Sequence, residues 1–150
     1  DRDLQLLVGS SLGALALAVA ASARPDRDLR LVLLAPAVGV HDAWAKQMGT
    51  EAMELWAEMG AIQYRHQGID QEVQLPYGLF TECREAASVA CAHPTAIVHG
   101  LQDAVIPVGE ALALAQRSPG VRRFTATADG HRLLNSLDEI GLAIDAVMRD

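Results

Sequence analysis

The stretch from Leu4 to Ala23 constrains the fold more than any other part of this sequence. An apolar run, 4–8, leads directly into Gly9-Ser10-Ser11-Leu12-Gly13, and an uncharged, alanine-rich segment follows. This order predicts a buried strand, a sharp turn and a helix. A serine hydroxyl becomes a useful nucleophile only when it is held out of the packed layer beside a base. The pattern therefore predicts Ser11 as a nucleophile, with an ordinary Gly/Ser turn as the simpler alternative.

The two glycines suit such a turn. A strained strand-to-helix turn crowds the residues two before and two after the serine, and glycine has no β-carbon to clash. This predicts that Gly9 and Gly13 are both required for close packing. Ser11 would then lie at a helix N-terminus, where free N–H groups favour negative charge. The N–H of Leu12 would point at the oxyanion of a bound substrate.

Further apolar runs separated by helical patterns predict an α/β fold with a mostly parallel sheet and flanking helices. The expected strands are 29–34, 95–99 and 121–127, with a short hairpin in 61–75 that turns at Gln67–Asp70. The first expected helix is 42–59, which Asp42 caps and Gly49–Thr50 breaks, and the second is 82–91, which Thr81 caps. The third is 107–117, with Pro107 in its first turn. The last runs from the capping box Ser136–Glu139 to Met148. The last helix has an apolar stripe of Leu137, Ile140, Ile144 and Val147.

Trp44, Met48, Leu55 and Met59 recur at helical spacing. This pattern predicts a face packed into the core. The alternative is a cap helix that lends an apolar wall to a substrate pocket, in which case Trp44 and Met48 would contact an acyl group.

Composition narrows the class of protein. A chain of 150 residues with 51% hydrophobic residues can fold as a single domain with a real core. Its net charge of −7 argues against binding nucleic acid. Cys83 and Cys91 do not make a disulfide framework and predict buried thiols in a reducing, cytoplasmic compartment. No Cys/His pair has metal-ligand spacing. The uncharged stretch after Asp3 is interrupted by glycine and serine, so we expect no membrane segment.

Three polar residues follow predicted strands in the order Ser11, Asp103, His131. In an open parallel sheet, functional groups gather at the carboxyl ends of strands. Asp129 is a rival acid that we interpret as a loop residue, and we interpret His99, inside a strand end, as structural. The remaining histidines suggest no partner: His41, His66 and His93.

The segments LLVGSSLGA, HGLQDAVIPV and DGHRL resemble the α/β-hydrolase superfamily, in particular its serine esterase and serine-aminopeptidase-like branch. The resemblance spans nearly the whole chain. It implies that Ser11 attacks an acyl carbonyl and His131 relays the proton. It also implies that Asp103 holds the imidazole and that Leu12 supplies one oxyanion donor, with no cofactor.

The resemblance covers only the C-terminal portion of an α/β-hydrolase fold. Residues 1–150 would form one partial domain that lacks the early strands, with 42–92 as a candidate cap or insert. The chain begins with Asp almost on a strand, which suggests that an N-terminal part is absent. The loop that gives the family its second oxyanion donor has no counterpart here. Strand 4–8 would have an open apolar edge, so we expect it to pair with a missing segment or with another copy.

Two classes of function follow. The first is a serine hydrolase that cleaves a small carboxylic ester, thioester or amide through an acyl-enzyme, with transfer to another acceptor as a variant that the sequence leaves open. The second is a non-catalytic binding module or an inactive fragment of the same fold. The reactivity of Ser11 discriminates between them.

Overall fold

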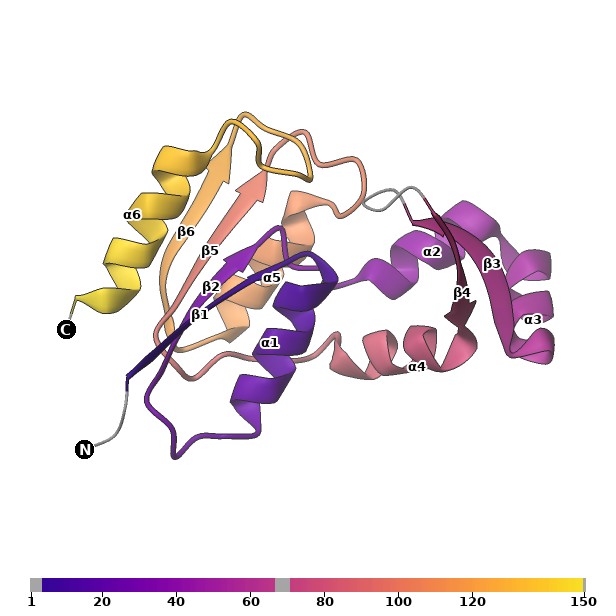
Figure 1. Ribbon diagram of the computed structural model, residues 1–150, viewed down its shortest axis with the longest axis horizontal. Helices are drawn as coiled ribbons and strands as arrows, with labels where there is room; N and C mark the ends of the chain where they lie inside the picture. Colours follow the sequence, from indigo (N-terminus) through magenta and orange to yellow (C-terminus); the bar gives the residue numbers. More distant parts are fainter. Residues whose placement is uncertain (1–3, 67–70, 150) are drawn as a thin grey trace. The chain divides into compact units, whose positions relative to one another are not determined.

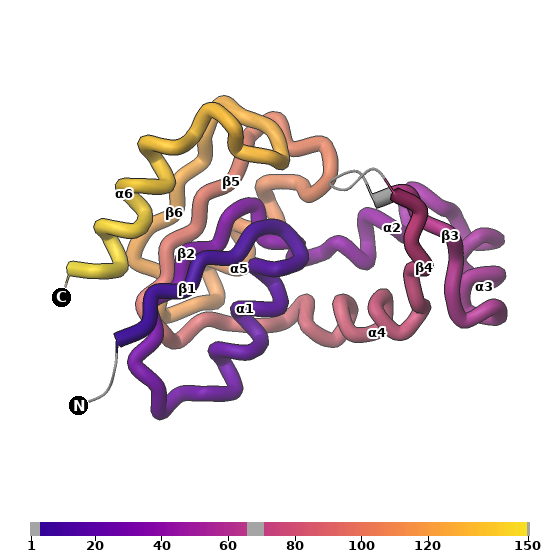
Figure 2. Tube along the Cα trace, in the orientation of Figure 1, coloured from indigo at the N-terminus to yellow at the C-terminus, as the bar shows by residue number. Residues whose placement is uncertain are grey.

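The computed structural model describes residues 4–66 and 71–149. The chain divides into two compact units, which we describe separately: Asp1–Val38 with Ser88–Asp150, and Gly39–Ala87. Figure 2 shows the chain leaving the first unit after its second strand and returning to it later. The assignment of 42–92 as a cap stays a prediction.

The first unit contains a four-stranded parallel sheet, which confirms the predicted α/β class. Its strands lie side by side in the order β1 (Gln5–Ser10), β2 (Leu29–Leu34), β5 (Thr95–Gly100) and β6 (Val121–Thr127). Its helices are α1 (Leu12–Ser22), α5 (Val108–Arg117) and α6 (Leu137–Met148). Figure 1 shows α6 on one side of the sheet and α1 and α5 on the other. Every residue of β5 is buried, as its apolar run predicts.

The core between the sheet and α6 is built from small and branched apolar side chains. Its buried members are Val32, Ala35, Ala96, Val98, Leu133, Ala143 and Val147. Ile140 and Ile144 pack against this cluster, as the predicted stripe requires. Leu137 is 73% exposed, so its place in the stripe was wrong. Leu137 is the first residue of α6, whereas the buried residues of this helix, Ala143 and Val147, lie further along it.

The strand β1 lies at the edge of the sheet, in agreement with the expected open edge of strand 4–8, but the prediction that the strand is buried was wrong. Leu4, Leu6 and Val8 are 43%, 38% and 51% exposed. Val8 pairs in register with Val32, which belongs to the core under α6, so these side chains point to the α6 face. That helix packs on β2, β5 and β6. The apolar face of β1 is thus uncovered in the described part of the chain.

The second unit combines three helices with a hairpin. It contains α2 (Val40–Met48), α3 (Thr50–Met59), the antiparallel pair β3 (Ala61–His66) and β4 (Gln71–Pro76), and α4 (Tyr77–Ala86). The predicted break at Gly49 is confirmed, because this residue has a φ of 78° and separates α2 from α3. The predicted hairpin strands are also confirmed, while the predicted turn at 67–70 lies outside the described residues.

Trp56 forms the core of the second unit. Its side chain is fully buried, and its Nε1–H donates to the Leu75 carbonyl at 2.9 Å. The ring centroids of Trp44, Tyr77 and Phe80 lie 5.9, 5.5 and 5.8 Å from the ring centroid of Trp56. Leu55 and Met59 are exposed, so the predicted packed face was wrong at these positions. The buried residue of α3 is Trp56, so a different side of this helix faces inward.

Three predicted caps were wrong. The helix α2 begins at Val40 after a left-handed Gly39, so Asp42 lies inside its first turn. The helix α4 begins at Tyr77 after an extended Pro76, and Thr81 donates its hydroxyl to the Tyr77 carbonyl instead of capping a helix over 82–91. The capping box at Ser136 does not form, because that hydroxyl is used elsewhere. Pro107 precedes α5 instead of lying in its first turn.

Candidate active site

Ser11 lies between β1 and α1 in a backbone conformation that few residues adopt, with φ 52° and ψ −122°. Its N–H donates to the Leu34 carbonyl at 2.8 Å, and its own carbonyl accepts the Ala37 N–H at 3.1 Å. These bonds tie the turn to the end of β2. Surrounding structure of this kind can hold a strained residue in place, and such residues are concentrated at functional sites.

Gly9 and Gly13 contribute unequally to this turn. A β-carbon on Gly9 would lie 2.9 Å from the Ala14 Cα and from the Gly13 carbonyl, so glycine is required there. A β-carbon on Gly13 would meet nothing within 4 Å, and the prediction that both glycines relieve crowding was wrong for Gly13. Leu12 is the first residue of α1, so its N–H has no acceptor within the helix.

Asp103 follows β5 in a loop that its own carboxylate organises. Asp103 Oδ1 accepts the backbone N–H groups of Val105 and Ile106 at 2.8 and 2.9 Å. The side chain is fully buried. These bonds fix the orientation of the carboxylate and leave Oδ2 for other partners.

His131 follows β6 in a loop that Asp129 organises. The Asp129 carboxylate accepts the N–H groups of Gly130 and Asn135, both at 2.8 Å, and the Ser136 hydroxyl at 3.0 Å. The Asn135 N–H, followed by the Gly130 N–H and the Ser136 hydroxyl, lowers the Asp129 pKa below its usual range, against an opposing effect of burial. Asp129 therefore closes the loop around His131, in agreement with its interpretation as a loop residue.

The two loops are joined through their backbones. The N–H of Leu101 donates to the Thr127 carbonyl at 2.8 Å, and the N–H of Gln102 donates to the Asp129 carbonyl at 2.9 Å. Leu133, on the far side of the His131 loop, is buried in the core under α6. The positions of the loops that carry the acid and the base are therefore set together.

The structure brings the three predicted residues into one hydrogen-bonded row. His131 Nδ1 lies 2.7 Å from Asp103 Oδ2, and His131 Nε2 lies 2.9 Å from Ser11 Oγ. The carboxylate oxygen can only accept, so Nδ1 carries the imidazole proton in the neutral ring. Nε2 is then the acceptor, and the Ser11 hydroxyl donates to it. The His131 side chain is 21% exposed while that of Asp103 is fully buried, so His131 is open to small molecules and Asp103 is not.

Several other predicted residues have defined positions. Cys83 and Cys91 are buried free thiols, as predicted. Burial raises the pKa of both, so neither is poised as a nucleophile. His93, for which the sequence suggested no partner, lies 3.1 Å from the carbonyls of Ala21 and Arg24. Trp44 and Met48 are half-buried in α2, and their role as substrate contacts stays a prediction.

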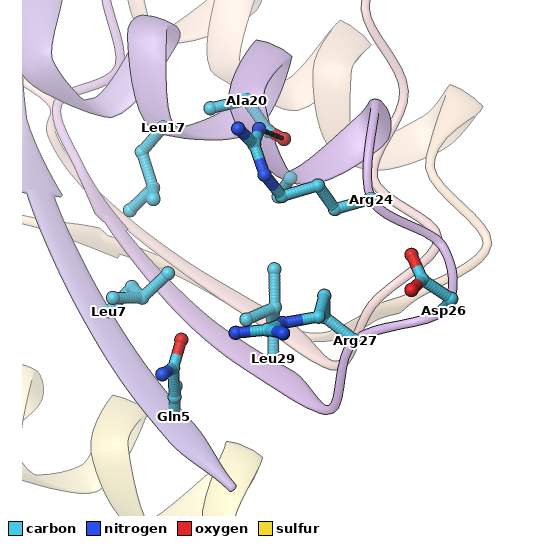
Figure 3. Close-up of a pocket in the computed structure, with 9 residues that line it drawn as sticks. Gln5, Leu7, Leu17, Ala20, Arg24, Asp26, Arg27 and Leu29 are labelled. Carbon is cyan, nitrogen blue, oxygen red and sulfur yellow. Dashed lines mark hydrogen bonds between the residues drawn. The ribbon is translucent and has the colours of Figure 1, made fainter. Parts of the chain in front are cut away.

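A cavity in the first unit is separate from the row of Ser11, His131 and Asp103. It has a volume of about 580 Å³ and lies beside the amino ends of β1 and β2, where Gln5 and Leu29 begin these strands (Figure 3). Arg24 borders it and donates Nη1 to the Ala20 carbonyl at 2.9 Å. Ser11 follows the opposite end of β1, so this cavity is not the candidate active site.

Among residues 4–66 and 71–149, no group of three His, Cys, Asp or Glu side chains is placed to hold a metal ion. No helix in those same ranges has the length and apolar character that crossing a membrane requires. The cytoplasmic location stays a prediction.

The family model described as Uncharacterised protein family (UPF0227) matches residues 1–136. The chain belongs to this family. It is also a member of the α/β-hydrolase superfamily, as the resemblance in the sequence implied. The structure of alpha/beta hydrolase domain-containing protein 10 from mouse aligns with 99% of this chain and 62% of that chain, at a TM-score of 0.71 and 26% identity.

Similar proteins are longer than this chain. The chain is 28% identical over 158 residues to palmitoyl-protein thioesterase ABHD10, mitochondrial, of Rattus norvegicus. The alignment covers 91% of this chain and 51% of the rat protein. The chain thus spans about half the length of the curated relatives it matches. A monoacylglycerol lipase from Paleococcus ferrophilus, 14% identical, shares the fold at a TM-score of 0.73 over 97% of this chain and 68% of that chain.

Proposed function

We propose that this chain carries the catalytic centre of a serine hydrolase that cleaves a small carboxylic ester, thioester or amide. The observation that carries the proposal is the row Ser11–His131–Asp103, whose two contacts measure 2.9 and 2.7 Å and whose members come from three separate loops. A non-catalytic protein has no need of all three side chains in this order. Membership in the α/β-hydrolase superfamily supports the same reading.

The reaction follows from the proton positions. Ser11 Oγ attacks the acyl carbon while its proton passes to His131 Nε2, and the oxyanion accepts a hydrogen bond from the Leu12 N–H. The bond to the leaving group then breaks, and Nε2 returns the proton to that group. Water attacks the acyl-enzyme with Nε2 again as the base, which releases the acid and restores Ser11. Asp103 remains ionised and stabilises the imidazolium.

The proposed substrate is a small molecule or group with an acyl linkage. The curated relatives are named palmitoyl-protein thioesterases, which supports the inclusion of thioesters. Trp44 and Met48 remain our candidates for contact with an apolar acyl group. The chemistry needs no cofactor, and the net charge of −7 makes nucleic acid a poor partner.

The test is labelling with a fluorophosphonate probe followed by peptide mapping. We expect the label on Ser11, and we expect Ser11→Ala to abolish it while Ser10→Ala, the adjacent serine at the end of β1, retains it. Removal of the triad serine typically costs at least about 10³-fold in turnover. His131→Ala should slow labelling to a similar extent. Full esterase activity in Ser11→Ala would overturn the proposal.

The second candidate is a binding module or an inactive copy of the fold. The open edge at β1 favours it, because an uncovered apolar strand is a ready site for another chain. A folded protein that never labels at Ser11 would support this candidate over the first.

A further inference from the structure

The Asp103 carboxylate has a neighbour that the triad does not account for. Its Oδ1 is held by two backbone N–H groups, and its Oδ2 lies 2.7 Å from His131 Nδ1. The same Oδ2 also lies 3.2 Å from His99 Nε2. Two imidazole rings therefore face one carboxylate oxygen.

His99 is the penultimate residue of β5, and its side chain is fully buried. Its Nε2 is 2.9 Å from the Ile106 carbonyl. Both neighbours of Nε2 are oxygens that can only accept, so Nε2 carries the proton. The Ile106 peptide that receives this bond is adjacent to the N–H that holds Asp103 Oδ1. His99 thus braces the Asp103 loop at its backbone and lies beside the free oxygen of its carboxylate.

A purely structural role explains this arrangement poorly. In the tautomer with Nε2–H, the Nδ1 atom of His99 is an acceptor, and it has no hydrogen-bond partner in the described part of the chain. A buried polar atom without a partner is costly, and an apolar side chain in this fully buried strand would avoid that cost. The presence of an imidazole at this position points to a use for its Nε2–H.

We infer that His99 is a positioning residue for the triad. Its Nε2–H fixes the Ile106 peptide and limits the directions in which Asp103 Oδ2 can turn, so that this oxygen stays in line with His131 Nδ1. It contacts neither substrate nor the serine. The expected effect of His99 on the reaction rate rests on the proposed function. The arrangement of the His99, Asp103 and His131 side chains at Oδ2 does not depend on that function.

The test uses two amide variants that differ by one methylene group. In His99→Gln the amide nitrogen is as many bonds from Cβ as Nε2 is, so the donor is retained. In His99→Asn the amide nitrogen reaches only the level of Nδ1, so the donor is lost. The first readout is the NMR signal of the His131 Nδ1 proton, which moves downfield as its hydrogen bond to a carboxylate shortens. The second is the rate of fluorophosphonate labelling of Ser11.

We expect His99→Asn to move the signal of the His131 Nδ1 proton upfield. The same variant should slow labelling of Ser11 about 10-fold to 100-fold, because small misplacements of catalytic groups cost rate on this scale. The labelling rate of His99→Gln should stay within about threefold of the wild type. Substrate turnover should fall in kcat with little change in KM. An unchanged proton signal in a folded His99→Asn protein overturns the inference.

A measurement on the unaltered protein guards against a variant that does not fold. The ¹⁵N shifts of His99 report its tautomer, and we expect the proton on Nε2. A proton on Nδ1 alone overturns the inference. If the His131 proton responds as expected but Ser11 never labels, the proposed function fails while the positioning role stands.

Discussion

Gly100, the last residue of β5, lies so close to the Asp129 backbone that a β-carbon at position 100 would overlap the Asp129 carbonyl oxygen. The same β-carbon would lie 2.6 Å from the Gly130 carbonyl oxygen. This contact joins the strand that leads to Asp103 with the loop that carries His131. The absence of a side chain at Gly100 thereby allows the loops that carry Asp103 and His131 to lie close together.

We therefore expect Gly100→Ala to slow Ser11 labelling and ester turnover by about 10²-fold, because displacement of the His131 loop by about 1 Å misaligns the base. Gly109→Ala is the matched control, since a β-carbon there would meet nothing within 4 Å. Stopped-flow or steady-state assays of both variants, with circular dichroism to check folding, make the comparison. Equal rates in the two variants would contradict the prediction.

Asp129 makes stability depend on pH. Hydrogen bonds in the folded protein lower the Asp129 pKa below the usual carboxyl range. The ionised carboxylate therefore stabilises the fold above about pH 4, near the pKa of an unfolded aspartate. This contribution is lost as the pH falls through the lower pKa of the folded protein. Asp129→Asn should lower the denaturant midpoint at pH 7, and the difference from wild type should narrow in acid. Asp26→Asn, in an exposed turn, is the control. A gap of the same size at pH 3 and pH 7 would count against this account.

Trp56 and its neighbour Leu55 offer a test of the second unit. Trp56 is fully buried among aromatic rings, whereas Leu55 is 53% exposed. Trp56→Ala should lower the free energy of unfolding by about 3–5 kcal/mol, and Leu55→Ala should change it by less than about 1 kcal/mol. Urea titration followed by circular dichroism measures both. The reverse order would show that α3 faces the other way.

The apolar edge at β1 predicts association. We propose that the 150-residue chain pairs with another strand there, and that in isolation it self-associates as its concentration rises. Leu6→Lys should shift the population toward monomer, because it places a charge on the open face. Leu112→Lys, at an exposed position on α5, should not. Light scattering after size-exclusion chromatography gives the masses, and an active wild-type monomer at all concentrations would refute the pairing.

The sequence predicted the sheet and the order of the site residues because both depend on local patterns. Four apolar runs separated by helical segments leave few arrangements other than a parallel sheet, and residues that follow such strands meet at one edge. That Ser11, Asp103 and His131 lie together was predicted in this way. The fold that the sequence implied agrees with the superfamily that the structure belongs to.

Features that depend on tertiary partners were not predictable. The apolar run at β1 resembles those of buried strands, so its local pattern did not predict that its side chains are exposed. Its place at the sheet edge was expected only from the resemblance, which implied that the early strands are missing. The Ser136 hydroxyl suits a helix cap in the sequence, but it donates to Asp129 once β6 and α6 are in place. One indication of the contact between His99 and Asp103 was present in the sequence, because the two residues are four positions apart across the end of a strand. That spacing alone does not show that their side chains meet.

The position of the serine at the sheet edge has a consequence for how activity would be lost. The strand before Ser11 is hydrogen-bonded to one neighbour, β2, whereas the acid and base are held by loops joined to each other. Partial opening of a protein begins at its least supported segments and costs less free energy than global unfolding. When no other strand is paired with β1, mild heat or denaturant would therefore displace Ser11 first and leave His131 and Asp103 paired. Any activity that depends on Ser11 would then be lost before a large change in secondary structure.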